Sequence, residues 1–125
     1  PKSLQKIIFN IENLTKNNKK LYLNLAISYG GKWDIVQAFQ QIVRKKIPSS
    51  KITENLIEKY LSTAGLLDPD LIIRVGGEKR LSNFVLWQGA YSELYFSKKY
   101  WPEFSGKDLD KAFQSYIQRK RRFGS

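Results

Sequence analysis

Apolar residues recur at the three- and four-residue spacing of an amphipathic helix in several stretches of the chain. The first stretch runs from Leu4 to Leu14. This spacing places its apolar side chains on one face and predicts a helix. The same pattern predicts further helices over residues 33–47, 53–61 and 105–117.

Three short apolar runs, over residues 21–27, 71–75 and 93–96, predict β-strands. The second run is apolar except for one arginine and is bounded by turn residues. Such a run is typical of a strand buried on both faces of a parallel sheet. Ser82–Asn83 is expected to cap one more short helix, over residues 84–90.

Two helix starts carry capping signals. Thr53 is placed to cap the third predicted helix, with Ile52 and Ile57 at the spacing of a hydrophobic staple. Ser105 and Asp108 have the spacing of a capping box at the start of the last helix.

The alternation of helices and strands predicts an α/β fold, in which helices wrap a parallel sheet. Three strands are few for such a sheet, so the fold is expected to be incomplete. The sequence shows no internal repeat, linker or domain boundary, and residues 1–125 are expected to form part of a single domain.

The chain has 22 Lys and Arg residues against 11 Asp and Glu residues, which gives a net charge of +11. This bias favours an anionic partner, such as a nucleic acid, an acidic lipid surface or a phosphorylated metabolite. Dispersed lysines are also typical of an ordinary solvated surface.

The sequence contains no cysteine and no histidine. Disulfides, thiol chemistry, imidazole bases and zinc sites are therefore excluded for these 125 residues. A metal would have to be held by oxygen ligands, which favours Mg²⁺. The lack of cysteine fits a cytoplasmic protein, and no apolar run is long enough for a transmembrane helix.

Two of the predicted strands are followed by glycine pairs, Gly30–Gly31 and Gly76–Gly77. In open α/β sheets, ligands bind at the carboxyl ends of the strands, where glycine lets the backbone approach the ligand. Glycine pairs are also common turn residues, and the pattern alone leaves both interpretations open.

The second strand end also carries the donors that a diphosphate requires. Arg74 lies at the strand end, Arg80 follows six residues later, and Ser82 begins the predicted helix. Guanidinium groups, a hydroxyl and a helix N-terminus together favour diphosphate binding. The alternative is that Arg74 pairs with Glu78 or Asp70 and that Arg80 faces solvent.

Residues 74–84 (RVGGEKRLSNF) resemble the signature of the cis-prenyltransferase family, of the undecaprenyl diphosphate synthase type. Two positions depart from the family pattern: Ser28 stands where the family usually has Asn, and Lys32 where it has Arg. The resemblance covers nearly the whole chain, including the segments 29–35, 86–88, 90–96, 101–104 and 121–124.

The resemblance implies roles for individual residues. Arg74, Arg80 and Ser82 match residues that hold the diphosphate of isopentenyl diphosphate, and Ser28 would lie near the reacting centre. Glu93 matches an acidic residue implicated in Mg²⁺-dependent substrate binding and in dimer contacts.

At the end of the chain, Arg122 and Gly124 match an element that reaches across a homodimer into the neighbouring diphosphate pocket. The resemblance thus implies that two copies of the chain act together.

The implied activity is that of a transferase. It joins an allylic prenyl diphosphate to isopentenyl diphosphate, releases diphosphate and creates a cis double bond, as in the synthesis of the undecaprenyl diphosphate lipid carrier of the bacterial cell wall. A long lipid product also implies peripheral contact with a membrane. Because the family's Asp-Gly-Asn-Arg-Arg segment, with its essential Asp, matches nothing here, we expect a C-terminal half that is inactive alone.

Two other functions are compatible with parts of the pattern. A non-catalytic partner subunit would contribute Arg122 and Gly124 to a catalytic chain, but such a subunit need not keep a diphosphate pocket of its own. The net charge and the basic run at residues 119–122 suggest an RNA-binding module. However, the aromatic residues fall mostly at apolar helical positions and not on a stacking platform, so no nucleic-acid partner is expected.

Overall fold

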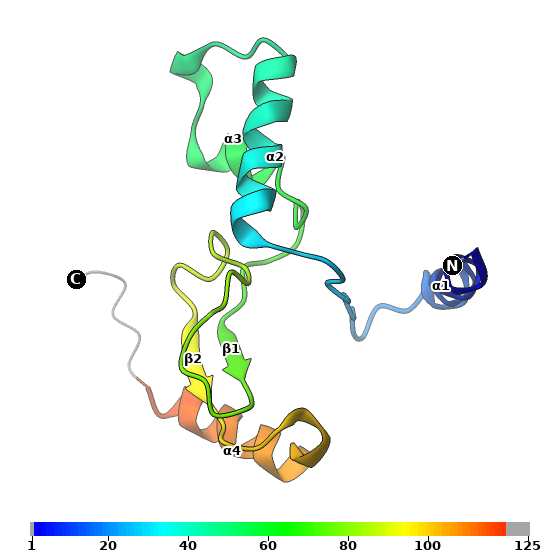
Figure 1. The fold of residues 1–125 in the computed structure, drawn as a ribbon, viewed down its shortest axis with the longest axis vertical. Helices are drawn as coiled ribbons and strands as arrows, with labels where there is room; N and C mark the ends of the chain where they lie inside the picture. The colour runs from blue at the N-terminus through cyan, green and yellow to red at the C-terminus, as the bar shows by residue number, and fades with distance from the viewer. Residues whose placement is uncertain (1, 120–125) are drawn as a thin grey trace.

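The structure is a computed structural model that describes residues 2–119. It contains four α-helices, two β-strands and two short 3-10 helices (Figure 1). In chain order they are α1 (Lys2–Thr15), α2 (Gly31–Arg44), η1 (Ser49–Lys51), α3 (Glu54–Glu58), β1 (Leu71–Arg74), β2 (Glu93–Phe96), η2 (Trp101–Glu103) and α4 (Gly106–Ile117).

The two strands form a parallel pair, as the sequence predicts. Leu71 is opposite Glu93 and Arg74 is opposite Phe96, so the carboxyl ends of both strands lie at the same end of the sheet. The described residues contain these two strands and not the three that were expected. The result is a small parallel sheet of the predicted α/β class, with α4 against β2.

The predicted strand over residues 21–27 is wrong for this structure. The segment is not part of a helix or a strand, and its large apolar side chains are 71–80% exposed. No neighbouring strand pairs with it among the described residues, and a single strand gains little from extension without a partner.

The predicted helix over residues 84–90 is also wrong. The segment folds as a series of turns. Ser82, Asn83 and Val85 have φ angles of +51°, +64° and +38°, which a right-handed helix does not allow. This loop leads from the region after β1 to the start of β2.

The core lies between α2 and α3. Ala38 and Ile42 from α2 pack with Ile57 and Leu61 from α3 and the residues after it. The Thr53 hydroxyl accepts a hydrogen bond from the Leu56 backbone N–H at 3.2 Å, which confirms the predicted cap. The predicted staple is consistent with the packing, since Ile52 contacts the same core that contains Ile57.

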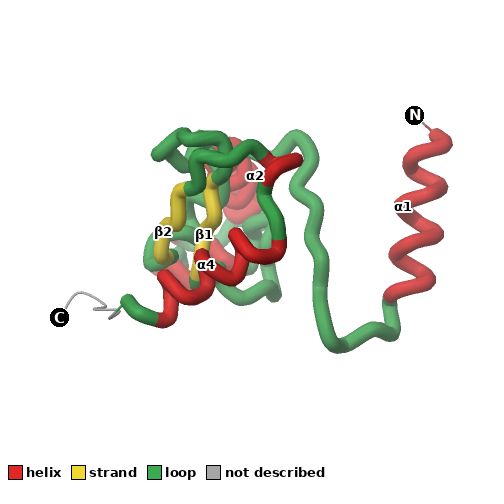
Figure 2. Tube along the Cα trace, turned by 90° about the horizontal axis from the view of Figure 1, so that it is seen from below, coloured by secondary structure: helices red, strands yellow, loops and turns green. Residues whose placement is uncertain are grey.

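The first helix, α1, has the predicted amphipathic pattern but buries none of its residues. Figures 1 and 2 both show it apart from the rest of the described chain, connected through residues 16–30. No helix among residues 2–119 is long and apolar enough to cross a membrane.

The last helix is anchored to the segment that follows β2. The carboxylate of Asp108 accepts hydrogen bonds from the Ser105 hydroxyl (2.6 Å) and backbone N–H (2.9 Å), which confirms the predicted capping box. It also accepts one from Lys99 Nζ at 2.8 Å. These bonds, led by the one from Lys99, hold the pKa of Asp108 well below its usual range.

Candidate functional site

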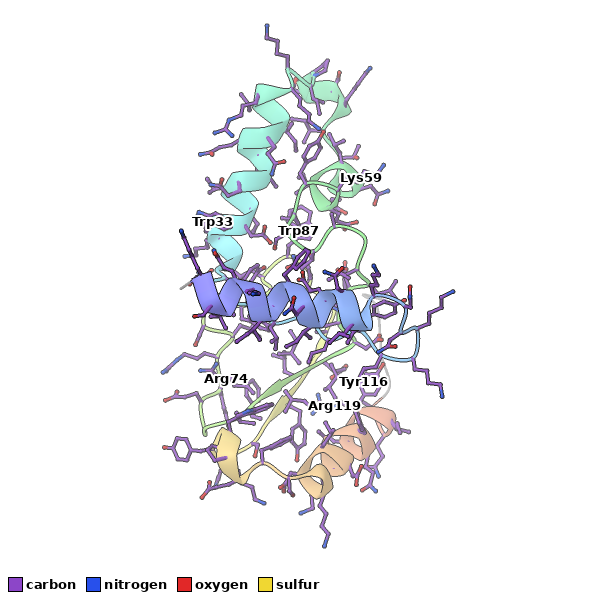
Figure 3. The ribbon with its side chains drawn as sticks, turned by 90° about the vertical axis from the view of Figure 1, so that its right-hand side faces the viewer. Trp33, Lys59, Arg74, Trp87, Tyr116 and Arg119 are labelled. Atoms are coloured by element: carbon purple, nitrogen blue, oxygen red, sulfur yellow. The ribbon has the colours of Figure 1, made fainter. Side chains whose placement is uncertain are left out.

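Arg74 is the last residue of β1 and places a guanidinium group at the carboxyl end of the sheet (Figure 3). Its Nε atom is buried and has no hydrogen-bond partner among the described residues. A buried donor without an acceptor is costly, and a phosphate oxygen is among the strongest acceptors for a guanidinium. Arg74 is therefore suited to an anionic ligand.

Gly76–Gly77 turns the chain directly after β1. Both residues have positive φ angles, +90° and +78°, which explains the need for glycine. Their backbone N–H groups donate to the carbonyl oxygens of Lys99 (2.7 Å) and Ser97 (2.9 Å). These two amides extend the pairing of β1 with the chain after β2 and are not directed to a ligand.

Arg80 lies on the loop that follows this turn. Its Nη1 atom is 2.8 Å from Oε2 of Glu78, and both side chains are about half exposed or more, at 66% and 48%. An ion pair so exposed is worth little, so a diphosphate could take the place of Glu78. The sequence left open whether Glu78 pairs with Arg74. In the structure the partner of Glu78 is Arg80.

Ser82 and Asn83 follow on the same loop, both exposed. Asn83 does cap a helix, but a different one from that predicted. Its backbone oxygen accepts a hydrogen bond from Gly31 N–H at 2.7 Å, and its side-chain Oδ1 accepts one from Lys32 N–H at 2.9 Å. The loop is therefore joined to the first turn of α2, 51 residues earlier in the chain.

Ser28 lies on the segment that leads into α2, with a φ of +54° and an exposed side chain. Next to it, the ring of Tyr29 meets the ring of Phe84 edge to face, with centroids 5.8 Å apart. Together with the Asn83 contacts, this pairing places the segment of Ser28 beside the loop of Ser82. The structure thus brings together two candidate segments that lie far apart in sequence.

The sequence did not predict that the carboxylate of Asp34, in the first turn of α2, would be buried. Asp34, only 2% exposed, accepts hydrogen bonds from the Ser62 backbone N–H (2.8 Å) and hydroxyl (2.9 Å). The Tyr29 hydroxyl is buried without a hydrogen-bond partner among the described residues. Burial, and then the nearby Asp34 carboxylate, raise the pKa of Tyr29. The sequence alone shows Asp34 only as an acidic residue near the start of the predicted helix over residues 33–47, where it favours the helix dipole.

Glu93 begins β2 and so lies at the amino end of the sheet, opposite to Arg74. Its Oε2 atom accepts a hydrogen bond from Arg119 Nη1 at 2.6 Å, and the same nitrogen donates to the Leu94 carbonyl at 3.0 Å. Figure 3 shows Arg74 and Arg119 on opposite sides of the strand pair.

Comparison with known proteins decides the family. Residues 1–124 match the family described as "Putative undecaprenyl diphosphate synthase". The chain belongs to the cis-prenyltransferase family. The ditrans,polycis-undecaprenyl-diphosphate synthase, (2E,6E)-farnesyl-diphosphate specific, of Buchnera aphidicola is 48% identical over 98% of this chain and 51% of its own length.

A second relative has a different stated specificity. The tritrans,polycis-undecaprenyl-diphosphate synthase, geranylgeranyl-diphosphate specific, of Thermoplasma volcanium is 49% identical over 99% of this chain and 50% of its own length. The chain thus spans about half the length of the curated relatives it matches.

The fold of this cis-prenyltransferase chain is also found in a solved structure. Lavandulyl diphosphate synthase from Lavandula x intermedia, determined with dimethylallyl diphosphate, superposes with a TM-score of 0.93 at 40% identity. The alignment covers all of this chain and 56% of the plant enzyme. The predicted family and fold class are confirmed.

The family implies Mg²⁺, and the described residues were tested for a site that could hold it. No group of three Asp, Glu, His or Cys side chains comes together among residues 2–119. Glu93 offers one carboxylate, which Arg119 engages. These residues do not form a metal centre by themselves, so Mg²⁺ at Glu93 stays a prediction that needs ligands from outside the described part of the chain.

Two predicted site residues, Arg122 and Gly124, lie outside the described residues. The last described residue is Arg119, which Glu93 holds near the amino end of β2.

Proposed function

We propose that this chain carries the isopentenyl diphosphate pocket of a transferase that condenses an allylic prenyl diphosphate with isopentenyl diphosphate. The observation that carries the proposal is the buried Nε of Arg74, which lacks an acceptor among the described residues at the carboxyl end of β1. That end is where ligands bind in open α/β sheets. Arg80 and Ser82 stand on the loop that follows, and Ser28 on the segment beside it.

In this reaction the bond between the allylic carbon and its diphosphate breaks, and the electron pair leaves with the diphosphate. A carbon–carbon bond forms to isopentenyl diphosphate, which then loses a proton. The residues of this chain would bind and orient the isopentenyl diphosphate through charge-assisted hydrogen bonds to its phosphates. Mg²⁺, when bound, would neutralise charge on a diphosphate.

The apolar surface supports the view that the chain works together with more polypeptide. The amphipathic face of α1, the segment 21–27 and one face of α2 all expose large apolar side chains. Exposed apolar side chains in such number mark an interface. We propose that the first half of a cis-prenyltransferase domain, with the essential Asp, covers it, and that the protein is inactive without that half.

Further parts of the proposal follow from the family. The complete enzyme would be a cytoplasmic homodimer that makes a cis-polyprenyl diphosphate of the bacterial lipid-carrier type. Its basic surface, in a chain of net charge +11, would favour contact with an anionic membrane where the lipid product leaves.

Titration of the chain with isopentenyl diphosphate by isothermal calorimetry tests the pocket. We expect saturable binding that Arg74→Ala weakens strongly and Lys79→Ala, a neighbouring exposed cation, leaves nearly unchanged. Absence of binding, or equal effects of the two substitutions, would contradict the assignment.

A further inference from the structure

We propose that Asn83 is a positioning residue. It joins the loop that carries Arg80 and Ser82 to the first turn of α2, and so fixes where these two side chains present their hydrogen-bond donors. This inference rests on the proposed function of that loop. It assigns to Asn83 a role that does not require contact with the substrate.

The first argument concerns the free N–H groups at the start of α2. A helix leaves its first N–H groups without intrahelical acceptors, and a side chain at the N-cap usually supplies one. The N-cap here is Gly30, which makes no side-chain bond. Asn83 supplies the acceptors instead, through its backbone oxygen to Gly31 and its Oδ1 to Lys32.

The second argument concerns packing. A Cβ atom at Gly30 would lie 2.9 Å from Nδ2 of Asn83, and one at Gly31 would lie 2.9 Å from Cγ of Leu86. At Gly31 the Leu86 backbone N would also lie 3.0 Å from this Cβ atom, so the loop approaches α2 more closely there than a residue other than glycine would allow. At Gly30 the Asn83 side chain would have to move. In this chain Gly30–Gly31 serves the contact between helix and loop.

The third argument concerns backbone conformation. Ser82 and Asn83 both have positive φ angles, a region that non-glycine residues occupy only when the surrounding structure holds them there. The two hydrogen bonds of Asn83 provide that hold. They act one residue from Ser82 and three residues from Arg80, so the loop takes its position from α2.

The start of α2 is itself fixed to the rest of the molecule. Asp34, in the first turn, is buried and binds both the backbone and the hydroxyl of Ser62. A loop joined to such a helix end is positioned before any ligand arrives, which lowers the entropic cost of binding.

The test uses the ¹⁵N-labelled 125-residue chain, with inorganic pyrophosphate as the ligand, and compares Asn83→Ala with Asn55→Ala, an exposed asparagine on α3. In Asn83→Ala we expect faster hydrogen exchange at the Lys32 amide and pyrophosphate affinity about tenfold weaker, the scale of one lost hydrogen bond. Asn55→Ala should change neither. Asn83→Asp keeps an Oδ acceptor and should restore protection of Lys32.

Unchanged amide resonances in β1 and β2 would show that each variant keeps its fold. If Asn83→Ala exposes the Lys32 amide but binds pyrophosphate as the parent does, the positioning role is refuted while the pocket stands. If the parent chain binds no pyrophosphate, the proposed pocket is refuted and the positioning role with it.

Discussion

Two segments of this chain have the same sequence pattern but adopt different structures. Residues 21–27 and residues 71–75 are both short apolar runs, and each is followed within a few residues by a glycine pair. The second run forms β1, while the first forms neither a helix nor a strand and is exposed. The difference shows that an apolar run specifies a strand only where the chain also provides its neighbour.

For β1 the neighbour is β2, in a parallel register of four residue pairs. The pairing continues beyond the strand through the amides of Gly76–Gly77, which donate to Ser97 and Lys99. Residues 21–27 have no such partner among the described residues. Without it their backbone groups remain with solvent, and their apolar side chains gain nothing from burial.

The glycine pairs differ in the same way. Gly76–Gly77 is needed for its positive φ angles. Gly31 is needed because the loop at Leu86 leaves no room for a side chain, and a side chain at Gly30 would displace that of Asn83. One pair is explained by local backbone conformation and the other by a contact between distant segments.

The largest expected effect comes from supplying the missing neighbour. The purified chain should incorporate no isopentenyl diphosphate into polyprenyl product. Co-expression with the first half of the Buchnera aphidicola relative should restore incorporation. It should also slow hydrogen exchange at residues 21–27 by at least about a thousandfold, as these become a paired strand. Robust turnover by the chain alone would overturn this account.

The sequence predicted the parts of the molecule that depend on local signals. Thr53 and the Ser105–Asp108 capping box start helices as expected, and the last predicted strand coincides with β2. Parallel pairing followed from the apolar character of the second run. These features depend on residues a few positions apart.

The parts that could not be predicted depend on distant contacts. Asn83 has the right chemistry for a cap, but the helix it caps begins 52 residues earlier. Asp34 binds Ser62, 28 residues later in the chain, and Glu93 is held by Arg119, just after α4. Such partners are set by the fold, and spacing along the chain does not reveal them. The candidate residues Arg74, Arg80 and Ser82 were found by residue type and order, which also could not show that Arg80 pairs with Glu78.

The next largest effect on activity is expected at the carboxyl end of β1. In the complemented enzyme, Arg74→Ala or Arg80→Ala should cost about 2–4 kcal/mol of isopentenyl diphosphate binding, because each removes a charge-assisted contact. This corresponds to a KM for isopentenyl diphosphate raised roughly 30- to 700-fold. The KM for the allylic diphosphate should change much less, and Lys79→Ala should change neither. Equal effects on both substrates would mean that these arginines serve the other pocket.

A smaller effect is expected at the anchor between the sheet and α4. Because the pKa of Asp108 is lowered in the folded chain, its charged form stabilises the fold. That stabilisation is present above the unfolded pKa of about 3.9 and is lost as pH falls from there toward the folded value. Tm measured between pH 6 and pH 2.5 (about the range that spans this change) should therefore fall less steeply for Asp108→Asn than for the parent.

The matched control for this anchor is Asp110→Asn, an exposed position on the same helix. It should keep the steep fall in Tm of the parent. If Asp108→Asn and the parent lose stability in parallel, the contacts of Asp108 with Lys99 and Ser105 do not contribute to the pH dependence.

The smallest effect, about a factor of two, is expected in a mixed dimer of the enzyme completed by its co-expressed first half. This experiment tests which subunit's pocket Arg122 serves. Arg74 lies at the carboxyl end of the sheet, while Arg119, three residues before Arg122, is held by Glu93 at the amino end. The family resemblance implies that Arg122 acts in the pocket of the neighbouring subunit. With Arg74→Ala in one subunit and Arg122→Ala in the other, both lesions then fall in one pocket, and about half of the activity should remain. With both substitutions in one subunit and none in its partner, each pocket carries one lesion and activity should collapse. The reverse pattern would place Arg122 in the pocket of its own chain, and full activity of Arg122→Ala alone would show that the residue takes no part in catalysis.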